Sequence, residues 1–173
     1  ADGLSIEKAR PDALEEATNA VGALRQADGG AMSRRVLARV GTVELGPHIT
    51  DCFFGNPPLD GATYSRVIEE ADTARSHMLG FLRDYDAILC PVIRQLAPRH
   101  GSTRDDTFLM WSYSMVYNLT CWPAATARAG ESKSGLPIGV QIVAGPWRDD
   151  IALTLTARVE HLMGGYHPPK SIT

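Results

Sequence analysis

The chain has 173 residues, of which 44% are hydrophobic, and its 17 Lys and Arg against 20 Asp and Glu give a formal net charge of -3. This length and apolar content predict one globular domain with a sizeable core and exclude a disordered chain. Charges of both signs are scattered, without a basic block, so neither a nucleic acid nor a membrane is expected as a partner.

The three cysteines, Cys52, Cys90 and Cys121, are odd in number and form no Cys-x-x-Cys pair. A disulfide framework and a zinc site are therefore not predicted, and reduced thiols fit a cytoplasmic protein. No stretch reaches the roughly 18 apolar residues of a membrane span. The sequence gives no reason to expect a metal or a cofactor.

Apolar residues in the first half recur at helical spacing. This spacing predicts a helix over 11–26 with Pro11 in its first turn, a shorter helix over 32–40, and a long helix over 64–82. The Gly- and Pro-rich passage 41–61 between them predicts a surface loop.

The second half of the sequence contains the predicted strands. Residues 87–90 are continuously apolar, which is typical of a strand covered on both faces in an α/β protein. We therefore expect an α/β fold with a mixed β-sheet sandwiched between helices. The remaining expected elements are a short helix over 108–115, strands over 123–128 and 136–144 around a polar loop at 130–135, and a last helix that Asp149 or Asp150 caps and that stops at Gly164-Gly165.

Side chains in the strand at 136–144 alternate between two faces. Gln141 shares its face with Gly139 and Val143, while Ile142 points the other way. If Gln141 is buried, its amide must be hydrogen-bonded.

Common catalytic signatures are missing from the sequence. It has no Gly-x-Ser-x-Gly elbow, no His-Glu-x-x-His, no Gly-Lys-Ser/Thr phosphate loop and no Gly-x-Gly-x-x-Gly. Cys90 and His100 are conceivable as a thiolate–imidazole pair, but Cys90 ends an apolar strand and His100 lies in a polar loop, which favours a plain buried thiol. The other histidines show no metal-ligand spacing.

Three motifs carry a resemblance to a known family. Residues 117–125 read YNLTCWPAA, residues 135–143 read GLPIGVQIV, and residues 84–91 read DYDAILCP. In this order they strongly resemble the closing region of amidase-signature enzymes, which cleave amide C–N bonds. The resemblance is strongest over 64–165 and weaker over the helical and loop region 1–63.

The resemblance implies that residues 1–173 are a single incomplete domain, the C-terminal part of the amidase-signature fold. The family uses a serine nucleophile, a second serine on a cis peptide and a lysine base, all in its N-terminal half. This chain has no Ser-Ser pair, and its three lysines, Lys8, Lys133 and Lys170, are expected to be solvated and charged. A lysine base must be neutral, so none suits the role, and no catalytic residue is assigned.

The family's Asn-Leu-Thr turn lies close to the nucleophile, which implies that this region forms a wall of the acyl pocket. The candidate substrate-binding residues are Trp111, Met115, Tyr117, Asn118, Thr120, Cys121 and Trp122. Core packing is the competing interpretation of Trp111, Met115 and Trp122, and Asn118 can equally tie the turn together. Cys121 stands where the family usually has glycine. A cysteine adopts a positive φ less readily than glycine does, which puts such a backbone conformation in question at this position.

Glutamine-specific relatives carry an acidic residue where this chain has Trp111 and Ser112, which favours a general amidase with an apolar acyl pocket. The first hypothesis is thus a C-terminal segment of an amidase, inactive alone, acting on a small-molecule amide with its N-terminal half. Such a segment would leave uncovered the apolar face that normally packs on the N-terminal half. The chain would therefore need that half as a partner, or it would self-associate. The alternatives are a non-catalytic stand-alone binding or scaffold module, and a hydrolase that uses Cys90 or Cys121.

Overall fold

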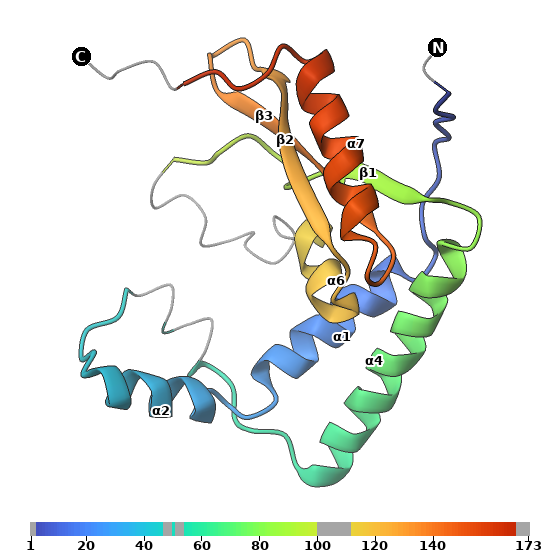
Figure 1. The fold of residues 1–173 in the computed structure, drawn as a ribbon. Coiled ribbons are helices and arrows are strands. Elements are labelled where there is room, and N and C mark those ends of the chain that lie inside the picture. The colour runs from blue at the N-terminus through green and yellow to red at the C-terminus, as the bar shows by residue number, and fades with distance from the viewer. Residues whose placement is uncertain (1–2, 47–49, 51–53, 100–111, 169–173) are drawn as a thin grey trace.

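The computed structural model describes residues 3–46, 50, 54–99 and 112–168. Its elements, shown in Figure 1, are α1 (Leu14–Gln26), α2 (Ala31–Val40), α4 (Gly61–Phe81), β1 (Ala87–Pro91), α6 (Ser112–Thr120), β2 (Ala124–Glu131), β3 (Pro137–Ala144) and α7 (Asp149–Leu162). Helices lie on both sides of one sheet, which confirms the predicted α/β class. The loop predicted over 41–61 falls partly outside the described residues.

The three strands form one sheet in the order β1-β3-β2, and both strand pairs are antiparallel. β1 and β2 therefore run in the same direction, and the connection between them passes through α6. β3 returns between them after a hairpin turn in which Ser132 and Leu136 pair. The predicted mixed sheet is thus antiparallel within the described residues, because the hairpin strand separates the two strands that run parallel.

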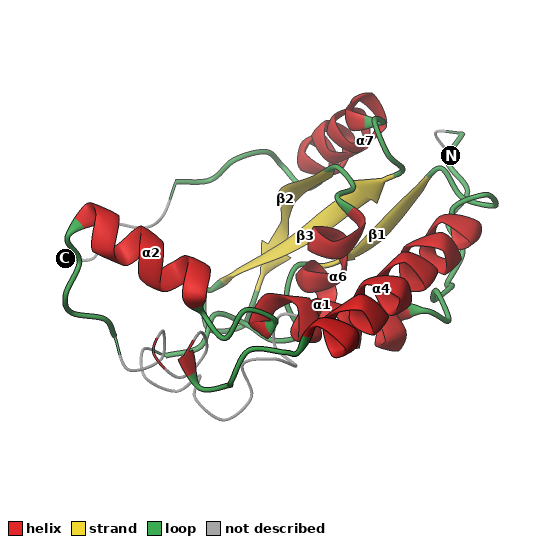
Figure 2. Ribbon diagram, turned by 90° about the horizontal axis from the view of Figure 1, so that it is seen from below, coloured by secondary structure: helices red, strands yellow, loops and turns green. Residues whose placement is uncertain are grey.

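The two faces of the sheet are covered by different helices. Figure 2 shows α7 on one side and α1, α4 and α6 on the other. The core on the second side joins residues from these three helices to Val143 of β3, with Ile88 and Cys90 of β1 packed against it. Met78 and Val116 are fully buried there. The predicted sandwich is therefore present around β3.

The outer face of β1 departs from the prediction of a strand covered on both sides. Leu89 pairs with Ile142, so its side chain lies on the α7 side of the sheet. α7 packs on β2 and β3, however, and Leu89 is 51% exposed. Among the described residues, β1 is an edge strand beyond the reach of α7, so the prediction is wrong for this face within that part of the chain.

Asp60 sets the start of α4. Its carboxylate accepts hydrogen bonds from the backbone N–H groups of Ala62 (2.9 Å) and Thr63 (3.0 Å). The bonds from Thr63 are the main reason why the pKa of Asp60 is lowered. This N-cap lets α4 begin at Gly61, earlier than the apolar pattern over 64–82 predicted.

Two other helix starts also differ from prediction. α1 begins at Leu14, after a turn in which the Leu14 N–H donates to the Pro11 carbonyl. The N-cap of α7 is Arg148, so the predicted cap at Asp149 or Asp150 is wrong. The carboxylates of Asp149 and Asp150 lie inside the first turn, where the positive end of the helix dipole stabilises their negative charge.

No helix among the described residues is long and apolar enough to cross a membrane.

A buried hydroxyl on α7 gives a stability prediction. Thr156 Oγ1 is buried without a hydrogen-bond partner. The isosteric change Thr156→Val removes this unsatisfied group, and we expect it to raise the free energy of unfolding by about 1 kcal/mol, measured by urea unfolding. Thr154→Val on the exposed face of α7 is the control and should give no such gain. A loss of stability in Thr156→Val would show that the hydroxyl is satisfied.

Candidate functional site

Helix α6 carries most of the predicted site residues, but it does not gather them into one pocket. Met115, Tyr117 and Trp122 are 6%, 8% and 7% exposed and belong to the interior, which supports core packing for Met115 and Trp122. Asn118 and Cys121 are exposed at the C-terminal end of α6, where Thr120 is half-buried. Trp111 lies outside the described residues.

A polar cluster connects α6 to the sheet. Gln141 of β3 is 4% exposed, and its Nε2 donates to the carbonyl oxygens of Tyr113 (2.8 Å) and Pro91 (3.1 Å). Cys90 Sγ lies 3.4 Å from the same nitrogen and 3.7 Å from the Tyr117 hydroxyl. The prediction that a buried Gln141 must be hydrogen-bonded is confirmed, and the cluster joins β1, β3 and α6.

Burial sets the acid–base character of this cluster. Desolvation raises the pKa of Cys90, and it raises the pKa of Tyr117 further, because both ionised forms would lie among apolar neighbours. A neutral thiol is a weak nucleophile. His100, which the sequence analysis considered as a partner for Cys90, lies outside the described residues. The Cys90 thiol is therefore suited to packing and hydrogen bonding rather than to attack.

An open groove lies next to this cluster, at the end of the sheet where β1 ends and β3 begins. Its volume is about 600 Å³, and its lining is mostly apolar. One wall is the segment 91–97 that leaves β1, and the other is formed by Pro137, Ile138 and Gly139. The two walls meet where Val92 Cγ2 would lie 3.6 Å from a side-chain carbon added at Gly139.

The sequence motifs alone do not assign these groove residues to the site. Pro137, Ile138 and Gly139 belong to a family motif, but the segment 91–97 extends beyond the motif that ends at Pro91. A usable signal is present in the sequence, since the apolar pair Val92-Ile93 directly follows a strand and a proline. Such loops at strand ends commonly carry binding residues.

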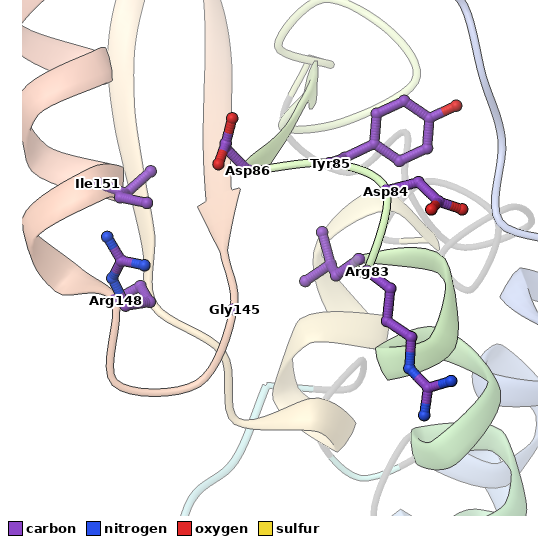
Figure 3. A pocket seen from close by; sticks show the side chains of 8 residues that line it. Arg83, Asp84, Tyr85, Asp86, Gly145, Arg148 and Ile151 are labelled. Carbon is purple, nitrogen blue, oxygen red and sulfur yellow. The ribbon is translucent and has the colours of Figure 1, made fainter.

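A second, smaller cavity of about 290 Å³ lies at the opposite end of β1, between the α4–β1 turn and the start of α7. Figure 3 shows Arg148 and Ile151 on the α7 side and Asp86 on the side of the turn. The Arg148 guanidinium makes two bonds to the Asp150 carboxylate at 3.0 and 3.2 Å. Opposite charges near this cavity thus pair locally.

The C-terminal end of α6 is closed by an unusual cysteine. Cys121 has a φ of 55°, in the left-handed region that favours glycine. The chain therefore adopts the glycine-like conformation at this position even though a side chain is present. Arg75 of α4 donates to the Leu119 carbonyl at 2.8 Å, which places a cation at the negative end of the helix dipole.

Among the described residues, no group of three or more His, Cys, Asp or Glu is arranged to hold a metal ion.

The backbone of Cys121 gives the next prediction. Cys121→Gly removes the side-chain strain of the left-handed conformation, and we expect it to raise the free energy of unfolding by about 1 kcal/mol in thermal unfolding. Cys121→Ala retains a Cβ and should show no gain. Equal stabilities of the two variants would argue against strain at this position.

The cluster also predicts how stability depends on pH. Cys90 and Tyr117 have raised pKa values in the fold, so the unfolded chain loses these protons first, from pH values near the ordinary 9.0 and 10.0 of the two groups. Below pH 9 the two groups make their whole contribution to the free energy of unfolding, and this contribution is lost as the pH rises above 9. Urea unfolding from pH 7 to 10.5 should show this loss, and a Cys90→Ala, Tyr117→Phe double variant should show a flatter curve. Identical slopes in both proteins would contradict the assignment.

Comparisons with known proteins place this arrangement in a family. A family model described as Amidase matches residues 5–153. Acylamidase of Rhodococcus erythropolis is 34% identical over 89 residues, which are 46% of this chain and 19% of that protein. Human fatty-acid amide hydrolase 2 is 27% identical over 106 residues, 61% of this chain and 20% of that protein. A glutamyl-tRNA(Gln) amidotransferase chain of Granulibacter bethesdensis is 28% identical over 144 residues, 82% of this chain and 26% of that protein.

Solved structures agree at the level of the fold. The structure of 6-aminohexanoate cyclic dimer hydrolase with its substrate covers 94% of this chain with a TM-score of 0.76 at 19% identity, and the chain covers 38% of it. A fatty acid amide hydrolase structure gives a TM-score of 0.73 over 94% of this chain and 34% of its own, also at 19% identity. The chain thus spans between 19% and 26% of the length of the three curated relatives above. Since the family model extends over residues 5–153, this chain belongs to the amidase family.

Proposed function

We propose that this chain is the C-terminal part of a longer amidase that hydrolyses carboxamides to a carboxylate and ammonia or an amine. The observation that carries the proposal is the apolar groove at the end of the sheet, in a chain of the amidase family. Its volume of about 600 Å³ lies within the usual range of small-molecule sites. In this proposal the groove receives the acyl part of the amide, and the structure carries no nucleophile beside it among the described residues.

The chemical step in this proposal belongs to residues outside the chain. A serine–serine–lysine triad supplies the attacking hydroxyl and the neutral amine that takes its proton. Within the described residues, the partly buried Cys90 thiol has a raised pKa and is not an activated nucleophile. Lys133 is exposed in the hairpin turn, away from the groove lining.

The residues of α6 have a supporting role in this proposal. Met115, Tyr117 and Trp122 are buried in the interior, and Trp111 is proposed to add to a wall of the acyl pocket. Asn118, Thr120 and Cys121 lie at the C-terminal end of the helix. They are proposed to support the loop of the longer enzyme that binds the substrate carbonyl. The free thiols of Cys90 and Cys121 fit a reducing compartment such as the cytoplasm.

Exposed apolar side chains support the need for a further part of the enzyme. Leu89 and Leu153 are 51% and 63% exposed, on one sheet face and its neighbouring helix. Large apolar surfaces favour association. We propose that the remaining part of the enzyme covers them and that the chain alone self-associates.

A stand-alone binding or scaffold module is the second candidate. The fully buried Met78, Val116 and Val143 favour it, because they show that the chain closes a core from its own elements. Such a module would be monomeric, cooperatively folded and inactive. Size-exclusion chromatography with thermal unfolding separates it from the self-associating segment of the first proposal.

An amide hydrolysis assay tests the first proposal. We expect the purified chain to release no ammonia from aliphatic or aryl amides, and a protein that includes the upstream reading frame to do so. Iodoacetamide should leave that activity intact, because the nucleophile is a serine. Thiol-independent ammonia release by the chain alone would overturn the proposal, and thiol-dependent release would favour the cysteine hydrolase.

A matched pair of variants in the longer protein tests the groove. Ile138→Trp places an indole in the groove, where it takes up space for a long acyl chain. It should raise the KM for a long-chain amide about tenfold and leave the KM for acetamide unchanged. Leu136→Trp is the control, since Leu136 is similarly exposed, at 38% against 40%, but does not line the groove. Equal effects of the two changes would remove the groove from the acyl site.

A further inference from the structure

Gln141 makes contacts with two parts of the chain that have separate roles at the groove. The Pro91 carbonyl belongs to the last residue of β1, which is also the first residue of one groove wall. The Tyr113 carbonyl belongs to the first turn of α6. The side chain of Gln141 itself projects from β3, two residues after Gly139 of the opposite wall. One amide thus links both walls to the first turn of α6.

The chemistry of a primary amide makes this link specific. The amide nitrogen carries two hydrogens, and two carbonyl oxygens lie within hydrogen-bond distance, at 2.8 and 3.1 Å. The amide oxygen has no hydrogen to offer, so only one orientation of the Gln141 side chain satisfies both carbonyls. A side chain of the same size without donors leaves both carbonyls without this partner.

The walls approach each other close to this link. Val92 Cγ2 would lie 3.6 Å from a Cβ added at Gly139, so the space between the two walls here is about one side-chain carbon wide. A small shift of the chain after Pro91 therefore changes the width of the groove there. The exit direction of that chain depends on the end of the β1–β3 pairing, where Pro91 faces Val140, and on the bond from Gln141.

We propose that Gln141 is a positioning residue that sets the width of the groove by holding the Pro91 carbonyl against β3 and α6. It acts on the groove through the segment 91–97 and takes no part in bond cleavage. This inference deepens the proposed function, and its kinetic test depends on that function, whereas its structural test does not.

Limited proteolysis of the chain is the structural test. Arg94 lies in the groove wall, and trypsin cleavage after it reports how firmly the wall is held. In Gln141→Met we expect cleavage after Arg94 to accelerate about tenfold relative to cleavage after Arg66 in α4, because the wall loses its hydrogen bond. Val143→Ala, a buried change two residues away in the same strand and on the same face, is the matched control. It should leave this ratio at its wild-type value.

Two results would overturn the inference: an unchanged ratio in Gln141→Met, or an equal rise in Val143→Ala. If Gln141→Met does not fold, Gln141→Asn replaces it. That side chain keeps both donors but is one methylene too short to reach both carbonyls, so the same rise in the ratio is expected.

Kinetics in the longer protein give the second test. Gln141→Met should raise KM for a long-chain amide about fivefold and leave kcat and the KM of acetamide near wild type, because only the fit of the acyl chain changes. An equal loss with both substrates would reduce Gln141 to a general structural residue and overturn the inference. A longer protein that hydrolyses no amide would refute the proposed function, while the cleavage ratio would still decide the role of Gln141.

Discussion

The burial of the Gln141 amide is the constraint on which the centre of this structure depends. A primary amide loses its water on folding and needs acceptors in return, and it finds them in carbonyls at the end of β1 and the start of α6. The exit of the chain from β1 and the position of α6 are therefore coupled to one side chain. Cys90 and Tyr117 fill the space beside it as neutral groups, because desolvation opposes their ionisation.

In the proposed function, this arrangement separates binding from chemistry. An apolar groove lies on one side of the polar cluster, while the Cys90 thiol within that cluster is partly buried and has a pKa raised by desolvation. A thiol with a raised pKa, without a charged partner among the described residues, packs well and attacks poorly. In the proposed function, this groove holds the acyl chain of the amide.

Coverage of the sheet is uneven for a topological reason. Three strands leave two edges, and a single helix, α7, lies over β2 and β3 but not over β1. The apolar run over 87–90 correctly predicted a strand, yet its composition cannot tell which neighbour covers each face. Leu89 is exposed because that neighbour is absent from the described residues.

The sequence by itself determined which regions of the chain carry helices and strands, because the spacing of apolar residues encodes the period of each element, and its motifs identified the family. It also determined that a buried Gln141 must be bonded, since that follows from the amide alone. It did not determine where α1, α4 and α7 begin, nor that α6 extends to Thr120 rather than ending near residue 115. Only the tertiary structure decided which carbonyls accept those bonds, that Met115 and Trp122 fill the core, and that the groove is lined by 91–97 and the start of β3. These features depend on contacts between residues about 30 to 50 positions apart, such as Tyr113 or Pro91 with Gln141, which no local pattern records.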